Sequence, residues 1–270
     1  MQFKSFLDSF FYTSDLIIFM IVFVSYVGIA LIIIWIVHTP RLRGFFSSFG
    51  RINGTFYSPA ATMFALTAAF MGATLVGGFN AHTESIKQER TALLLYVDFV
   101  NNTPSLANQN LQYQVKNYLQ SALDEEWSLL ENEKISSRTG GIFQEIFWKT
   151  IAIAPALEGT QAGRELSKIL DSWYEARSKR ISFRWHHVEH LRWVVLFMVA
   201  FLLQLSVAAT HLSSSKRTMS LTIGITTALI ISVITPLALN VDHYSGMLEV
   251  SKTPLYEVYE ILGEQFNADR

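Results

Sequence analysis

The 270-residue sequence contains no cysteine and few charged residues. Without cysteine the chain forms no disulfide, holds no thiolate metal site and has no cysteine nucleophile. Charged residues make up 16% of the chain, whereas a typical soluble domain carries about 25%. The net charge of −1 leaves no strongly basic surface to neutralise the phosphates of a nucleic acid. These shortages exclude nucleic acid as an expected partner and indicate a membrane protein.

Four long uncharged stretches account for the shortage of charge. They cover residues 16–37, 60–79, 193–209 and 219–239. A helix needs about 20 apolar residues to cross a bilayer, and the apolar part of a secretory signal is only about 7–15 residues long. The first stretch is longer than that, so we interpret it as a permanent anchor. The pattern predicts an all-α membrane protein with four transmembrane helices.

The polar region between the second and third stretches also has helical periodicity. Ile86, Leu93 and Val97 predict that the second span continues beyond the bilayer as one long helix. Further apolar stripes are Leu111, Val115, Leu119 and Ala122, and then Leu166, Ile169, Leu170, Trp173 and Ala176. We expect a loop at residues 136–141. Residues 164–211 lack Gly and Pro, so one helix could run into the third span.

These patterns predict a helical extramembrane stalk domain inserted between spans two and three. We expect spans one and two in residues 1–79, the stalk in 80–190, spans three and four in 191–240, and a C-terminal tail in 241–270. The short loops 38–58 and 212–218 hold five basic residues and no acid. Basic short loops stay in the cytoplasm, which predicts an inner-membrane protein with a periplasmic stalk and periplasmic termini. The basic residues just before the third span argue for the opposite orientation.

The second span has a stripe of small residues, one at every fourth position. The stripe consists of Ala61, Ala65, Ala69, Ala73 and Gly77. Small side chains let another helix approach closely, so the stripe packs either inside one subunit or between subunits.

Larger and hydroxyl-bearing residues accompany the stripe on the same span. They are Phe64, Thr67, Phe70, Met71 and Thr74. They are either ordinary residues of the helix core or part of a hydrophobic constriction that gates a pore by dewetting.

Three arginines, Arg177, Arg180 and Arg184, share one helix face just before the third span. In a ring of subunits they would form a basic collar that concentrates anions. The alternatives are ion pairs with Glu84 and Glu89 of the adjacent stalk helix, or contact with lipid phosphates.

His186 and His190 lie four residues apart and are weak candidates for a shared metal site. Histidines beside a membrane are also ordinary interface residues, so we expect neither a resident metal nor a cofactor. No phosphate loop, hydrolase elbow or metalloprotease helix occurs in the sequence. The spans contain no carboxylate, which disfavours a proton-coupled transporter. We therefore do not expect an enzyme.

Several short motifs carry a resemblance that covers most of the chain. They are Ala81 with Glu89-Arg90, then Tyr118, Glu126-Trp127, Arg180-Ile181 and Trp193, and finally Asp242 to Gly246 followed by Val250-Ser251 and Pro254. In these motifs the chain resembles the bestrophin-like family of bacterial membrane proteins. It departs from the family pattern where Tyr244 replaces a Pro-Phe pair and where a proline before Trp193 is absent.

The resemblance implies a four-span subunit within a ring-shaped homo-oligomer that conducts anions along a pore lined by the second span. It also implies a cytoplasmic large domain, which conflicts with the orientation expected from the basic loops. The alternative function is a non-conducting scaffold or accessory subunit that binds a protein partner through its stalk. Membrane lipids are expected partners in both cases.

Overall fold

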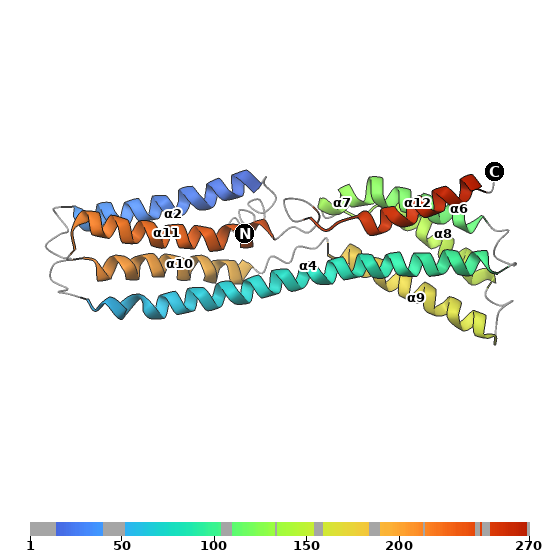
Figure 1. The fold of residues 1–270 in the computed structure, drawn as a ribbon, viewed down its shortest axis with the longest axis horizontal. Coiled ribbons are helices and arrows are strands. Elements are labelled where there is room, and N and C mark those ends of the chain that lie inside the picture. Colours follow the sequence, from blue (N-terminus) through green and yellow to red (C-terminus); the bar gives the residue numbers. More distant parts are fainter. Residues whose placement is uncertain are drawn as a thin grey trace. The chain divides into compact units, whose positions relative to one another are not determined.

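The structure is a computed structural model that describes residues 15–39, 52–103, 110–132, 134–153, 159–183, 190–212, 214–240, 244 and 249–268. Every regular element in these ranges is a helix (Figure 1). Four helices are long and apolar enough to cross a membrane: Leu16–His38, Gly54–Asn101, Leu191–Thr210 and Lys216–Leu239. The predicted all-α fold with four transmembrane helices is confirmed.

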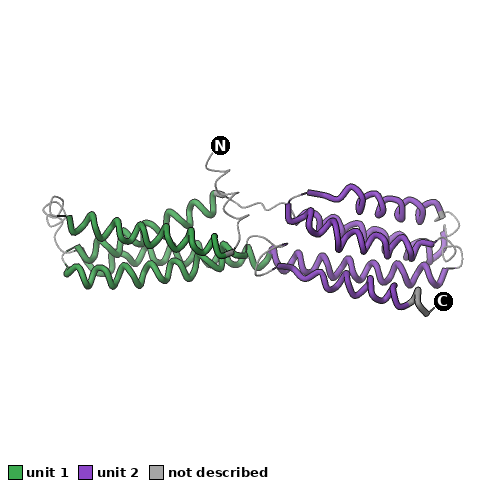
Figure 2. Tube along the Cα trace, turned by 90° about the horizontal axis from the view of Figure 1, so that it is seen from above, with its two compact units in different colours: residues 1–77, 187–242 green, residues 78–186, 243–270 purple. Residues whose placement is uncertain are grey.

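The chain divides into two compact units (Figure 2). Unit 1 contains residues 1–77 and 187–242, and unit 2 contains residues 78–186 and 243–270. Helix α4 (Ser58–Asn101) contributes residues to both units. The long helix that was expected to continue out of the second span is therefore present.

Unit 1 is a bundle of long apolar helices. It contains α2 (Asp15–His38), the short η1 (Gly54–Tyr57), the first part of α4, α10 (His190–Thr210) and α11 (Lys216–Leu239). The α2 side chains that enter the core are Ile18, Val22, Tyr26, Ala30, Ile33 and Val37, which recur every three or four residues. In the core the Gln204 side-chain amide donates to Thr227 Oγ1 at 2.8 Å and to the Tyr26 carbonyl at 3.3 Å. These bonds join α10 to α11 and α2.

Unit 2 packs amphipathic helices around a separate core. It contains the rest of α4, α6 (Leu111–Ser121), the π-helical turn η2 (Ala122–Glu126), α7 (Trp127–Glu131), α8 (Ser137–Ile153), α9 (Gln161–Ser182) and α12 (Thr253–Ala268). The predicted stripes enter this core: Ile86, Leu93, Val97, Leu111, Val115, Leu119, Leu166, Leu170 and Trp173 are buried. Helix α12 adds Leu255, Val258 and Leu262 and packs against α6. The segment expected to be a C-terminal tail therefore holds a helix of unit 2.

Two local predictions were wrong. The loop expected at residues 136–141 is the start of α8, because the Ser136 hydroxyl accepts the Thr139 N–H at 3.1 Å and the Thr139 hydroxyl pairs with Ser121 at 2.7 Å. The single helix expected over residues 164–211 ends at Ser182. There the Arg180 carbonyl accepts the Tyr244 hydroxyl as well as the Phe183 N–H, which closes the last turn.

Candidate functional site

The small-residue stripe of α4 lies on the outside of unit 1. Ala65, Ala69, Ala73 and Gly77 are exposed, and only Ala61 is half-buried. A side chain built at Gly77 would meet nothing within 4 Å. Ala65, Ala69, Ala73 and Gly77 are thus not packed inside the described part of unit 1, and this face is open to another copy, a pore or lipid.

The bulky candidates on α4 divide between its two faces. Phe64 and Met71 are 7% and 5% exposed and belong to the core of unit 1. Phe70 is 72% exposed. Sequence reasoning missed three further exposed apolar side chains on the part of α4 that belongs to unit 1, namely Met63, Leu66 and Val76. Leu66 is one residue beyond Ala65 and three before Ala69, so helical spacing could have placed it on the same face.

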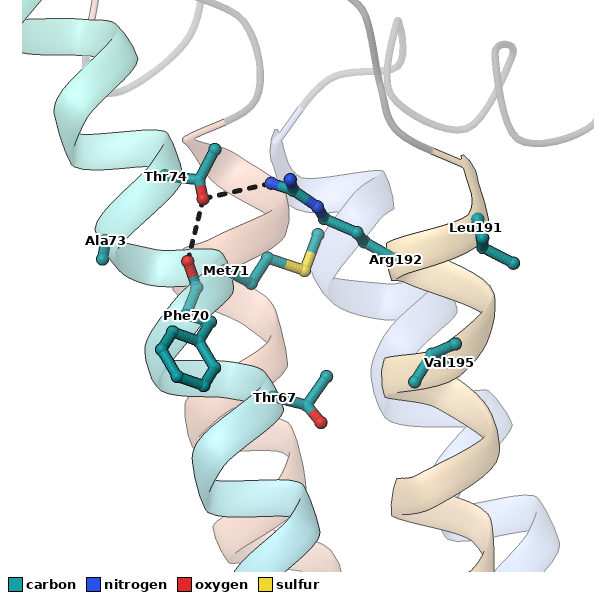
Figure 3. A pocket seen from close by; sticks show the side chains of 8 residues that line it. All are labelled: Thr67, Phe70, Met71, Ala73, Thr74, Leu191, Arg192 and Val195. Carbon is teal, nitrogen blue, oxygen red and sulfur yellow. Dashed lines mark hydrogen bonds between the residues drawn. The ribbon is translucent and has the colours of Figure 1, made fainter.

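A groove of about 670 Å³ lies between α4 and α10 (Figure 3). Its α4 wall holds Thr67, Phe70, Met71, Ala73 and Thr74, and its α10 wall holds Leu191, Arg192 and Val195. Arg192 reaches across and donates to the Thr74 hydroxyl oxygen at 3.1 Å, and that hydroxyl donates to the Phe70 carbonyl at 2.9 Å. A guanidinium therefore lies beside a segment of α4 that carries no charge of its own.

The core of unit 2 contains a buried network of charged side chains. The Arg180 Nε donates to Glu89 at 2.6 Å, and its Nη2 donates to Glu126 at 3.0 Å. Arg177 donates to the other oxygen of Glu126 at 2.6 Å. The hydroxyl of Tyr118 donates to Glu89. Two carboxylates therefore balance two guanidiniums in a site that is almost closed to solvent.

The five members of this network come from four elements of unit 2. Helix α4 supplies Glu89, α6 supplies Tyr118, and the π-helical turn η2 supplies Glu126. Arg177 and Arg180 lie three residues apart on α9, so both face the same way. The network thus links α4, α6 and α9, and the Arg177 guanidinium also lies 5.2 Å from the centre of a buried phenylalanine ring.

Burial and neighbouring charges set the protonation of this network. Burial would lower the pKa of Arg180, but the charge of Glu89, followed by Tyr118 and Glu126, raises that pKa well above its ordinary value. Burial, followed by the charge of Glu89, raises the pKa of Tyr118, so its phenol stays protonated and donates. Separating either partner of a buried ion pair would leave an uncompensated charge in the core, which is strongly unfavourable. The network therefore holds its charged side chains, and the helices that carry them, in place.

Two of the three arginines on the predicted face are thus buried inside unit 2. Arg180 is fully buried, and Arg177 is nearly so. Both arginines are ion-paired, and Arg180 pairs with Glu89. Pairing with Glu89 was one of the alternatives that the sequence left open. Glu84, the other partner named there, is exposed. Arg184 lies outside the described residues. The collar itself stays a prediction, because one chain does not show a ring.

The histidine candidates for a metal lie where the structure describes no side chain. His186 is outside the described residues, and only the backbone of His190 is described, at the start of α10. Among the described residues no group of three His, Cys, Asp or Glu could hold a metal ion.

Comparison with known proteins gives a family and a fold. The family description Bestrophin-like domain matches residues 24–255. Crystal structures of two mutants of a bacterial bestrophin homologue from Klebsiella pneumoniae have a TM-score of 0.68 with this chain, at 11% and 12% identity. They cover 92% and 93% of this chain, and 98% of each of those chains is covered. No curated protein matches the sequence.

Proposed function

Because this chain belongs to the bestrophin-like family, we propose that it assembles into a ring of identical subunits and conducts anions, acting as a channel rather than an enzyme. In this proposal the exposed face of α4 lines the axis of the ring. Glu89, Tyr118, Glu126 and Arg180, which carried the resemblance in the sequence, meet in the buried network of unit 2. Their role in the proposal is to hold α4, α6 and α9 in one arrangement.

The observation that carries the proposal is the exposed small-residue face of α4 in unit 1. Ala65, Ala69 and Ala73 contribute little apolar area towards lipid, but they let helices of neighbouring copies approach closely. Leu66 and Phe70 project from the same exposed side. Repeated around a ring, bulky apolar side chains form a constriction that can gate by dewetting.

The charges of unit 1 favour anions over cations. No acidic side chain is present among those the structure describes in unit 1. The guanidinium of Arg192 bonds to Thr74 on α4, beside the proposed axis. A fixed guanidinium at this place raises the local concentration of anions.

The proposed location is the inner membrane, with unit 2 and both termini in the periplasm. Support comes from the five basic residues of the two short loops, which favour a cytoplasmic position for those loops. Among its described residues unit 2 contains no further helix that is both long and apolar enough to cross a membrane, apart from its share of α4.

The absence of cysteine makes a direct test possible. Single cysteines at Leu66, Ala69 or Ala73 are expected to react with a membrane-impermeant, charged thiol reagent and to change chloride flux through protein reconstituted in liposomes. Cysteines at the buried Phe64 or Met71 are matched controls that should react slowly, with no effect on flux. If the reagent changes the chloride flux of none of these cysteine variants, α4 does not line the axis of the ring.

The second candidate function is a non-conducting scaffold that binds a protein through unit 2. The observation in its favour is a set of exposed aromatic side chains on α8 and α9: Trp148 is 63% exposed and Tyr174 is 57% exposed. Exposed Trp and Tyr side chains are frequent anchors of protein interfaces. Two results together would favour this function. The folded oligomer would show no anion flux, and a protein partner would lose binding to the Trp148→Ala variant but still bind the matched Trp35→Ala variant.

A further inference from the structure

A second groove of unit 1, on different helices, has the character of a ligand site. It lies between α2 and α11, and its volume of about 570 Å³ falls within the range of about 300–1,000 Å³ that is usual for small-molecule sites. Its lining residues on α2 are Phe23, Val27, Ala30, Leu31, Ile34 and Trp35, and those on α11 are Lys216, Ser220, Gly224, Thr227, Ala228 and Ile231.

The groove is polar at one end and apolar along the rest of its length. Helices α2 and α11 run in opposite directions, so Trp35 near the end of α2 lies at the same end as Lys216, the first residue of α11 (Figure 1). Among the described lining residues, Lys216 and Ser220 are the polar groups at this end, and none is acidic. The hydroxyl of Thr227, deeper in the groove, is already used: it donates to the Ile223 carbonyl and accepts from Gln204, both at 2.8 Å.

The length of the groove corresponds to one leaflet of a bilayer. On α11 the lining extends over 15 residue steps, from Lys216 to Ile231, which is about 22 Å at 1.5 Å per residue. Half of a hydrocarbon core is about 15 Å thick, and the headgroup region lies outside it. A cation and a tryptophan therefore lie at the level of the headgroups, with the apolar floor reaching to the middle of the membrane.

The first turn of α11 contains two cations and no acid. These are Lys216 and Arg217. The N-terminal end of a helix carries a partial positive charge, which favours anions and disfavours cations. An anion at this point would relieve the unfavourable arrangement, and membrane surfaces supply one as lipid phosphate.

Among the described residues, the middle of the groove is open beside Gly224. A side chain built at Gly224 would meet nothing within 4 Å. Gly224 and Ala228 both line the groove and lie about one helical turn apart on α11. Neither carries a side chain larger than a methyl group, which leaves room for an extended acyl chain along this part of α11.

We propose that this groove binds one anionic phospholipid, with its phosphate on Lys216 and one acyl chain along Gly224 and Ala228. The occupant is a lipid rather than a second copy of the chain because a cation at the headgroup level, above an uncharged floor one leaflet long, complements an anionic amphiphile. The site lies on α2 and α11 and does not depend on the proposed pore at α4.

The test is the quenching of tryptophan fluorescence by brominated phosphatidylglycerol or brominated phosphatidylcholine, titrated into the full-length protein in detergent micelles. The signal of the site is the part of the quenching that disappears in Trp35→Phe. We expect phosphatidylglycerol to bind more tightly than phosphatidylcholine. Lys216→Gln should weaken phosphatidylglycerol binding about five-fold, since one basic residue near the headgroup contributes about that much.

Two matched comparisons distinguish binding in the groove from general attraction of anionic lipid to the basic surface. Arg217→Gln removes the neighbouring cation and should have a smaller effect than Lys216→Gln. Gly224→Leu fills the groove and should weaken both lipids, whereas Gly28→Leu, on α2 outside the lining and also with open space around it, should weaken neither. If Gly224→Leu does not fold, Ala228→Leu also fills the groove and should likewise weaken the binding of both lipids.

Three results would overturn the proposal. Equal losses in Lys216→Gln and Arg217→Gln would show diffuse attraction to the surface. Lipid binding that is unchanged when the groove is filled would place the acyl chain elsewhere. A disulfide between two copies of Gly224→Cys, formed in lipid, would show that a second copy occupies the groove.

Discussion

The buried network of unit 2 makes a quantitative prediction for Glu89→Gln. The Glu89 carboxylate accepts the Arg180 Nε at 2.6 Å, the Arg180 Nη2 at 3.3 Å and the Tyr118 hydroxyl. An amide has one acceptor oxygen, and its NH₂ would face one of these donors. The change also leaves two guanidiniums with the single carboxylate of Glu126 in a site that is almost closed to solvent.

We expect Glu89→Gln to destabilise unit 2 by about 3–5 kcal/mol, the usual effect of removing one partner of a buried pair. That is a large part of the about 5–15 kcal/mol that stabilises a typical protein. Glu257→Gln is the matched control, because Glu257 pairs with Arg90 at 2.9 Å while both side chains are partly exposed. Exposed pairs contribute about 0–1 kcal/mol.

The assay is urea unfolding of the full-length protein in detergent micelles, followed by far-UV circular dichroism. Glu89→Gln should shift the transition to much lower urea, whereas Glu257→Gln should leave it nearly in place. Similar shifts for the two variants would refute the view that the network holds unit 2 together.

Three further predictions concern assembly, pH and orientation. Ala69→Leu should disrupt assembly measured by size and light scattering, because it places a bulky side chain on the exposed face of α4; an unchanged assembly would assign this face to lipid. The folded state raises the pKa of Tyr118 above the ordinary tyrosine value of about 10, so it favours the neutral phenol. The neutral phenol therefore stabilises unit 2 below about pH 10, and this stabilisation is lost as the pH rises beyond about 10. Tyr118→Phe should therefore flatten the fall in stability between about pH 9 and about pH 11 in urea unfolding, and an equally steep fall would exclude Tyr118 as its source. Reporter fusions after Arg217 and Arg270 should be cytoplasmic and periplasmic respectively, and cytoplasmic activity after Arg270 would reverse the proposed orientation.

Hydropathy and periodicity were sufficient for the fold because burial on one helix face leaves a strong signal in the sequence. The four spans and the stripes of α6 and α9 are confirmed for this reason. The start of α8 was missed because two glycines suggested a loop, while the Ser136 cap and the Ser121–Thr139 hydroxyl pair depend on tertiary contacts. The end of α9 likewise depends on Tyr244, which is 64 residues away from Arg180.

The site could be predicted only in part. Sequence spacing placed Arg177 and Arg180 on one face, but it could not show whether that face meets solvent or the core. Pairing with Glu126 depends on the π-helical turn η2, which has no clear signal in the sequence. The small-residue stripe was evident, whereas its exposure follows from how α4 packs in unit 1 and became visible only in the structure.

The most direct test of the proposed function is an electron-microscopy reconstruction of the purified protein in lipid nanodiscs. The proposal predicts a closed ring of identical subunits around a solvent-filled axis, with Ala69 and Ala73 of every copy facing that axis. A monomer, or a ring in which these residues of α4 face lipid, would contradict it.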